Sequence, residues 1–152
     1  MSVSLYGSGN TVIQVVQASN STSASTTGST YVASNLTASI TPQSTNSKIL
    51  ILINAPIAIT QLSAAAYAMG LQLNRNSTAV FTDNAVGDSL YNGEYGNYIG
   101  TWKQRTPLIY LDSPSTTSST TYTLYFAAYQ GTAFVSNSSA IANITLLEIS
   151  GA

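Results

Sequence analysis

The chain has 152 residues, of which 44% are hydrophobic and only 6% are charged, and its net charge is −1. This length suits one domain with a sizeable core, which needs neither a disulfide nor a metal for stability. The near-neutral charge argues against nucleic-acid binding, because phosphates are neutralised by Lys and Arg. No apolar run approaches the ~20 residues of a transmembrane helix, so we also expect no membrane partner.

Uncharged groups supply most of the polarity. Ser and Thr make up more than a quarter of the residues, and Asn adds more. A surface of short hydroxyls and amides is unusual for a free cytosolic monomer, which generally carries more charge. It is more typical of extracellular particles and of proteins that pack against copies of themselves.

The ordered stretches are rich in Thr, Val, Ile and Tyr, which favour strands. Turn signals recur roughly every 8–15 residues, a spacing typical of an all-β sandwich or barrel. We predict about 8–11 short strands in an antiparallel sandwich. In chain order they are Thr11–Ala18, Thr30–Ala33, Leu36–Thr41, Lys48–Ala55, Tyr67–Arg75, Thr78–Thr82, Asn97–Lys103, Leu108–Asp112, Thr120–Tyr129, Thr132–Ser136 and Ala140–Ile149.

One stretch has an alternative interpretation. A short helical turn over Gln61–Met69 competes with extended chain, because three consecutive alanines there have high helix propensity. The separators are too short to divide domains, so residues 1–10 are predicted to form an N-terminal arm and residues 11–152 a single β-sandwich domain. These separators are Ser19–Ser29, Thr41–Ser47, Asp83–Tyr95 and Ser113–Ser119.

Several predicted strands carry apolar residues on both faces. In Thr120–Tyr129 one face is apolar and the other is only half polar. Lys48–Ile53 shows no alternation, and Ala140–Ile149 places large apolar residues on both sides. With so few charges, apolar outward faces favour an oligomer interface. The alternative is that these are central strands of the core.

The sequence offers little for catalysis. His and Cys are absent, which removes the Ser-His-Asp triad, Cys-His pairs and the usual zinc ligand sets. Asp83, Asp88 and Glu94 share one Gly/Asn-rich loop, where they could pair as glycosidase carboxylates or hold Ca²⁺. The loop lacks EF-hand spacing, and Asp83 and Asp88 are better explained as turn formers. We therefore expect no enzyme activity, no catalytic or metal residues and no cofactor.

Aromatic residues form the more suggestive candidate site. Rings beside Gly and Asn suit a protein interface, where Tyr and Trp are enriched, or stacking against a carbohydrate. Interface or core is the favoured interpretation, and a ligand surface is the alternative. The candidate residues are Tyr91, Tyr95, Tyr98, Trp102, Tyr125 and Tyr129.

A set of segments, taken in order, resembles a module found in tail-fibre and virion-surface proteins of marine and freshwater phages, notably cyanophages. It covers most of the chain from Thr11 to Ile149, although Tyr91–Trp102 does not match. The resemblance implies a jelly-roll-like β-sandwich in a virion, a homotrimer, and no catalytic residues. The segments are Val12–Gln17, Leu36–Pro42, Ser47–Ile51, Leu71–Arg75, Tyr110–Pro114 with the hydroxyl run to Thr123, and Ile144–Ile149.

Two virion roles follow from the resemblance. The chain starts at Met1 and ends soon after Ile149, so the module is expected to stand alone. That favours a capsid decoration (cement) protein, which contacts the major capsid protein on the outer surface of the head. The alternative is a tail-fibre tip or receptor-binding protein that contacts host glycan or protein. Residues Met1–Thr11 lack the features of a secretory signal, so synthesis in the host cytoplasm and delivery by assembly or lysis are expected.

Overall fold

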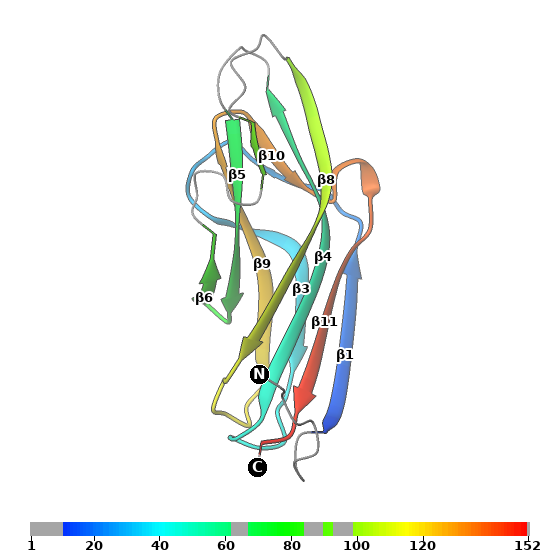
Figure 1. Cartoon of the computed structure of the whole chain (residues 1–152), viewed down its shortest axis with the longest axis vertical. Coiled ribbons are helices and arrows are strands. Elements are labelled where there is room, and N and C mark those ends of the chain that lie inside the picture. Colours follow the sequence, from blue (N-terminus) through cyan, green and yellow to red (C-terminus); the bar gives the residue numbers. More distant parts are fainter. Residues whose placement is uncertain (1–10, 62–66, 84–89, 93–98, 152) are drawn as a thin grey trace, which may run out of the picture.

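Two antiparallel sheets packed face to face make up the protein (Figure 1). The computed structural model describes residues 11–61, 67–83, 90–92 and 99–151. We call the sheets sheet A and sheet B. Sheet A contains β1 (Val12–Asn20), β11 (Ala142–Ile149), β4 (Lys48–Gln61), β8 (Gly100–Asp112), β10 (Thr132–Val135) and β2 (Ala24–Thr26). Sheet B contains β3 (Val32–Ile40), β9 (Thr120–Tyr129), β5 (Tyr67–Arg75), β6 (Thr78–Thr82) and β7 (Leu90–Asn92).

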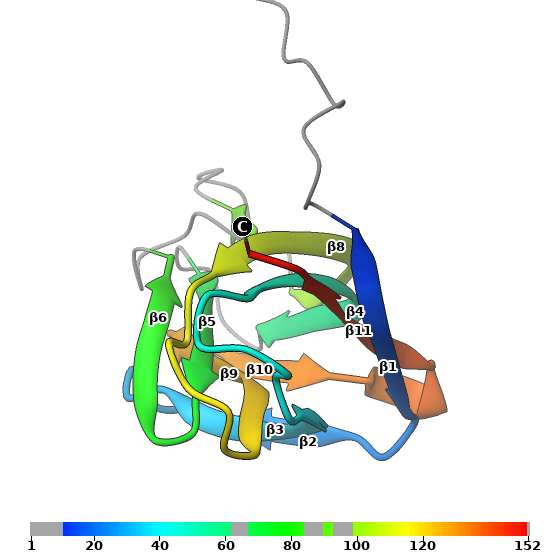
Figure 2. The ribbon, with the colours of Figure 1, turned by 90° about the horizontal axis from the view of Figure 1, so that it is seen from below.

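The pairing of eight strands is nested, as Figure 2 shows end-on. β1 pairs with β11, β3 with β9, β4 with β8, and β5 with β6. This order results when one long antiparallel ribbon is rolled into two layers, and the arrangement is a jelly roll. The prediction of an all-β, antiparallel, jelly-roll-like sandwich is confirmed.

Two strands are much longer than the short strands predicted. β4 has 14 residues and β8 has 13, because each continues through a proline. Pro56 lies where β4 changes partner, between its pairing with β11 up to Asn54 and with β10 from Ile57, so no ladder bond is lost there. Pro107 lies in β8, an edge strand, where proline is tolerated.

The remaining boundaries differ in smaller ways. The predicted strands over residues 30–41 merge into β3 with an irregularity between Ala33 and Thr37, and β2 lies within the Ser19–Ser29 separator. Gln61 ends β4 and Tyr67 begins β5, so these two residues are strand and not helix. Residues 62–66, the middle of that alternative, and residues 1–10, the predicted N-terminal arm, lie outside the described residues.

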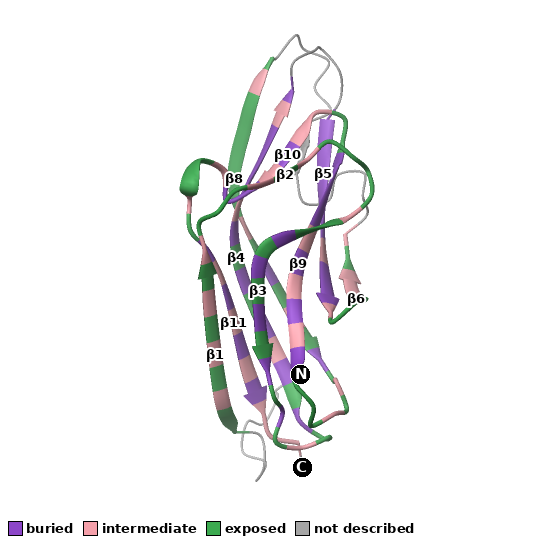
Figure 3. Ribbon diagram, turned by 180° about the vertical axis from the view of Figure 1, so that it is seen from behind, coloured by how far each residue is buried: buried purple, intermediate pink, exposed green. Residues whose placement is uncertain are grey.

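The core lies between the sheets and follows the alternation read from the sequence. In β9, Tyr122, Leu124, Phe126 and Ala128 point inward and are at most 2% exposed. Figure 3 shows this alternation as buried and exposed residues along β3 and as buried and half-buried residues along β9. Burying such side chains contributes roughly 1.5–3 kcal/mol each. From sheet A the core receives chiefly Ile49, Ile51, Ile53, Ile57, Ile59, Leu108, Ile144 and Leu146.

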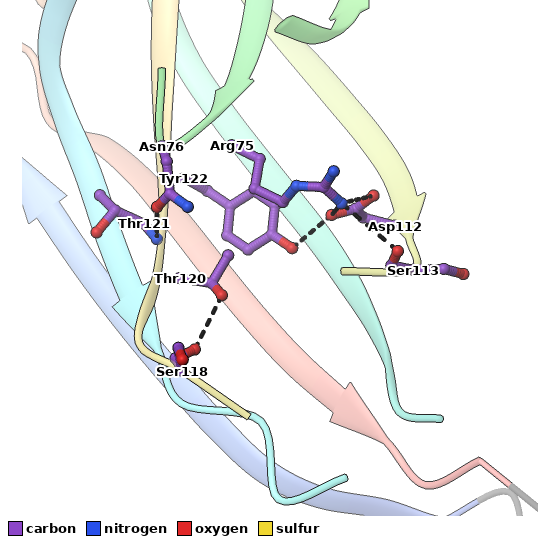
Figure 4. Close-up of polar contacts among 8 residues, drawn as sticks. All are labelled: Arg75, Asn76, Asp112, Ser113, Ser118, Thr120, Thr121 and Tyr122. Carbon is purple, nitrogen blue, oxygen red and sulfur yellow. Dashed lines mark hydrogen bonds and ion pairs between the residues drawn. The ribbon is translucent and has the colours of Figure 1, made fainter. Parts of the chain in front are cut away.

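A polar cluster joins the two sheets near one end of the sandwich (Figure 4). Arg75 in β5 donates from Nη1 to both carboxylate oxygens of Asp112 in β8, at 3.0 and 2.9 Å. The buried Tyr122 hydroxyl in β9 donates to Asp112 Oδ2 at 2.7 Å. Burial, followed by this hydrogen bond, raises the pKa of Tyr122 far above its usual value near 10. The Asp112 carboxylate therefore connects three strands that belong to both layers.

Candidate interaction surface

An apolar row crosses the outer face of sheet A. Val15 in β1 lies opposite Leu147 in β11, Leu147 lies opposite Leu50 in β4, and Leu50 lies opposite Leu111 in β8. Directly opposed residues of antiparallel strands project from the same side of a sheet. Their inward-facing neighbours fill the core, so this row faces outward.

Further apolar residues extend the row on both sides. Leu52 pairs with Ile109 next to it, and Val12 pairs with Ile149 on its other side. Ile109 is 69% exposed, Val15 59% and Leu111 49%. We call the whole set the apolar outer face; it consists of Val12, Ile13, Val15, Leu50, Leu52, Ile109, Leu111, Leu147 and Ile149.

The apolar outer face is large for a patch on a monomer. Its nine side chains expose on the order of 600 Å², the upper end for the largest apolar patch on an ordinary monomer and close to the ~800 Å² that each partner contributes to a standard interface. Lys48, opposite Ile149, brings a positive charge to its margin. Such a surface fits contact with another protein better than permanent exposure to water.

A hollow of about 730 Å³ adjoins this face at the end of the sandwich where the C-terminus lies. Leu111 and Ile149 contribute its apolar side, and Lys48 contributes a charge. The remaining lining is mostly hydroxyl and amide, from Thr45, Asn46, Ser47, Ser113, Ser115 and Ser150. The hollow gives the apolar face a polar, recessed border.

The outer face of sheet B is different in chemistry. Thr37 Oγ1 lies 2.9 Å from Thr123 Oγ1, and Ser39 Oγ lies 2.7 Å from Thr121 Oγ1, each pair joining β3 to β9. In β5, Gln72 Nε2 donates to Asn74 Oδ1 at 2.6 Å. Hydroxyls and amides that bond to one another across strands make this a wettable face without charge.

The predicted aromatic site is divided between the sheets. Trp102 in β8 lies opposite the buried Ile59, which places it on the inner side of sheet A, where it is 48% exposed. Tyr125, half-buried, and Tyr129, 42% exposed, lie on the outer side of sheet B. The structure therefore does not bring Trp102 together with these two tyrosines.

The other members of that set are only partly described. Tyr91 in β7 and Tyr129 in β9 occupy the register positions on either side of Ala68 in β5. Tyr95 and Tyr98 lie outside the described residues. The assignment of this set as an interface or ligand surface stays a prediction.

The carboxylates that the structure describes have structural surroundings. Asp112 belongs to the inter-sheet cluster, and the fully buried Glu148 accepts a hydrogen bond from the Gln43 backbone N–H at 2.7 Å. The Gln14 amide, oriented with its nitrogen toward Glu148 and the Thr41 carbonyl, donates to both at 3.1 and 3.2 Å. The Asp83 carbonyl accepts from the Tyr31 hydroxyl at 2.6 Å. Asp88 and Glu94 lie outside the described residues, so the calcium hypothesis stays open.

In the part of the chain with described placement, no three His, Cys, Asp or Glu side chains gather closely enough to hold a metal ion. Likewise, none of the described helical segments has the length and hydropathy to cross a membrane.

Sequence reasoning found part of the apolar outer face. Lys48–Ile53 and Ala140–Ile149 were expected to place apolar residues outward, and they supply Leu50, Leu52, Leu147 and Ile149. The contributions of β1 and β8 were missed. Their signal is weak in sequence, because Val15 and Ile109 join the row only through the register of strands far apart in the chain.

Comparisons with known proteins identify no family. No protein-family model matches the sequence, and a search of curated proteins gives no match. Among solved structures, VP2 of infectious bursal disease virus in a subviral particle is similar at 9% identity and a TM-score of 0.44, over 91% of this chain and 37% of that one. VP2 of the Gx strain is similar at 13% identity and a TM-score of 0.39, over 91% and 36%.

A bacterial protein is similar at the same level. Dimeric latent PorU from Porphyromonas gingivalis has 11% identity and a TM-score of 0.43, over 97% of this chain and 14% of that one. The chain thus spans well under half the length of the solved structures it resembles.

Proposed function

We propose that this protein is a structural component of a bacteriophage particle, a decoration protein on the outer surface of the head. In this proposal the apolar outer face of sheet A lies against the major capsid protein or another virion protein. The protein has no catalytic role, is made in the host cytoplasm and reaches the particle by assembly.

The apolar outer face carries the proposal. A row of four large apolar side chains, one from each of β1, β11, β4 and β8, is in register; Val15 and Leu111 are exposed, and Leu50 and Leu147 are half-buried. Exposed apolar patches of this size mark sites of protein contact. Val12–Gln17 and Ile144–Ile149, which lie in β1 and β11 of this face, resemble parts of a virion-surface module. This resemblance favours a phage particle as the place of the contact.

The proposal includes self-association of the protein, without fixing the number of subunits. A chain with 6% charged residues has little charge repulsion to keep its copies apart. The subunit number of three rests on the resemblance alone, and sedimentation equilibrium of the pure protein measures it.

A second candidate function rests on the exposed aromatics. Trp102 and Tyr129 are 48% and 42% exposed, and rings at this exposure suit stacking on sugars as well as protein contact. In this alternative the protein is a tail-fibre tip or receptor-binding protein that contacts a host glycan or protein.

Copy number and location in purified phage particles test the first proposal against the second. A decoration protein is expected in heads separated from tails, at a copy number comparable to the major capsid protein. A few copies confined to tails would contradict it. A reconstruction of the particle that shows sheet A of this jelly roll against the capsid would support it directly.

Two matched variants separate the functions by binding. Leu111→Ala shortens the apolar outer face and is expected to weaken attachment to heads that lack the protein, with host-cell binding unaffected. Trp102→Ala is expected to weaken host-cell or glycan binding if the receptor-binding alternative is correct. Both residues lie in β8 and are nearly equally exposed, so each variant serves as the stability control for the other.

A further inference from the structure

In the described part of the chain, β1 forms an edge of sheet A. β1 pairs with β11 on one side, and no strand among the described residues pairs with its other side. Figures 1 and 3, from opposite sides, both place β1 at the margin of the molecule. Unpaired N–H and C=O groups along such an edge form a template for another strand.

The two edges of the β1–β11–β4–β8 layer differ in their protection. β8, the opposite edge, carries Lys103, Arg105 and Pro107, and charges and proline on an edge oppose further pairing. β1 carries Val, Ile, Gln, Ala, Ser and Asn, with no charge and no proline in its nine residues. The amide of Gln14 points inward and is engaged by Glu148, so it does not block the edge.

The apolar row also ends at this open edge. It runs from Leu111 through Leu50 and Leu147 to Val15, the member on the edge strand itself and 59% exposed. A second β1 strand placed antiparallel and centred on Val15 would put Val15 opposite Val15 of the other copy. That register places the two rows end to end across the seam.

We propose that β1 is the site of a twofold, strand-to-strand contact between two copies of this chain, with Val15 at the twofold axis. The seam joins the two A sheets into one continuous sheet, and it doubles the length of the apolar outer face. This contact uses the strand edge and not the face, so it stands independently of the virion role proposed above. It predicts a dimer, or an even-numbered assembly, where the resemblance implies a trimer.

The absence of cysteine from the chain allows a sharp test. In the proposed register the two Val15 Cα atoms are ~4.5–5.5 Å apart on the same side of the sheet, within the range of a disulfide. The Val15→Cys variant is therefore expected to form a covalent dimer on mild oxidation in dilute solution, measured on a non-reducing gel.

Two control variants measure the disulfide cross-linking expected from chance collision and from face-to-face contact. Gln17→Cys lies on the same side of the same strand and is also exposed, but its two thiols would be ~14 Å apart. Leu111→Cys lies at the far end of the row, where the thiols would be ~33 Å apart across the seam. Both are expected to cross-link at least about tenfold less than Val15→Cys.

The outcomes distinguish this inference from the function proposed for the face. Cross-linking of Val15→Cys alone supports the edge contact. Cross-linking of Leu111→Cys in place of Val15→Cys would show that copies meet through their apolar faces and would overturn it. Equal cross-linking of Val15→Cys and Gln17→Cys, or none in any variant that keeps a native strand spectrum, would also overturn it. None of these results depends on attachment to phage heads, which is measured separately.

Discussion

The outer faces of the two sheets differ in chemistry, although each lies on the far side of a strand layer from the core. Both belong to strands that bury side chains between the sheets, but the outer side of sheet A also carries Lys48, Lys103 and Arg105. Sheet B presents cross-strand pairs of hydroxyls such as Thr37 with Thr123. Sheet A presents a row of Val and Leu, including Val15 and Leu111. A two-layer domain needs one apolar face per sheet, so the second apolar face of sheet A is not required by the fold.

The difference shows how function can be inferred where no catalytic group is present. The hydroxyl face of sheet B is satisfied by its own hydrogen bonds and by water. The apolar face of sheet A gains free energy only when something covers it. The two faces are therefore expected to behave differently when they are altered in the same way.

Charging the apolar outer face is expected to have the largest effect. The double variant Ile109→Lys with Leu111→Lys should weaken attachment to phage heads at least about 100-fold, because covering two such side chains contributes roughly 3 kcal/mol or more. Both residues are exposed in the chain, so the free energy of unfolding should change by less than about 1 kcal/mol. A pull-down or sedimentation assay with decoration-free heads measures the loss.

The matched control is Thr37→Lys with Ser39→Lys on the outer face of sheet B. These residues are also exposed and have the same spacing along one strand. Attachment should stay within about threefold of the unaltered protein. If both double variants lose attachment equally, the contrast between the faces has no functional meaning.

Breaking the cluster of Arg75, Asp112 and Tyr122, which links the two sheets, is expected to have the next largest effect. Asp112→Ala leaves the buried Tyr122 hydroxyl without its acceptor and Arg75 without its partner. The free energy of unfolding should fall by about 3 kcal/mol, less than for a fully buried pair because the Arg75 side chain is 29% exposed. Urea unfolding measures it, and a fall of less than 1 kcal/mol would mean that the cluster is not a principal link between the sheets.

Alkaline pH should reveal the same cluster through Tyr122. The pKa of this tyrosine is raised in the folded protein, chiefly by burial, so the folded form keeps its proton when the unfolded form loses it above pH 10. Stability from this group is full below pH 10 and falls as the pH rises further, by about 1.4 kcal/mol per pH unit. Tyr122→Phe should remove that part of the slope; an unchanged slope between pH 10 and 11 would contradict the assignment.

The smallest effect is expected for the hydroxyl pairs of sheet B. Thr37→Val and Thr123→Val should each change the free energy of unfolding by less than about 1 kcal/mol, because exposed hydrogen bonds exchange readily with water. A double-mutant cycle should give a coupling of roughly 0.2–1 kcal/mol, as for other cross-strand Thr pairs. A larger coupling would show that the face of sheet B is itself built for stability.

Much of the fold could be predicted from local patterns. The alternation in Thr120–Tyr129 correctly assigned Tyr122 and Leu124 to the core, since period-two alternation depends only on neighbouring residues. The break before Thr132 was also correct, where Gln130 and Gly131 both take positive φ in the turn between β9 and β10. The lengths of β4 and β8 were underestimated. Whether a strand can continue through Pro56 or Pro107 depends on which strands pair with it at that point, and the sequence does not show this.

The candidate site was also predicted from the sequence only in part. Apolar residues on both sides of Lys48–Ile53 and Ala140–Ile149 predicted a second apolar surface, and Leu50 and Leu147 lie on it. The aromatic set of Trp102, Tyr125 and Tyr129 was grouped by residue type, and the structure places Trp102 on sheet A, apart from the two tyrosines on the outer side of sheet B.

The sequence by itself determined that the protein is an all-β sandwich of low charge, because strand propensity, alternation and composition are local properties of the chain. Only the tertiary structure decided which apolar residues stand together. Val15, Leu50, Leu111 and Leu147 form one row because a rolled ribbon brings residues nearly a whole chain length apart into register. The same rolling leaves β1 at an open edge, a position that its own residues do not specify.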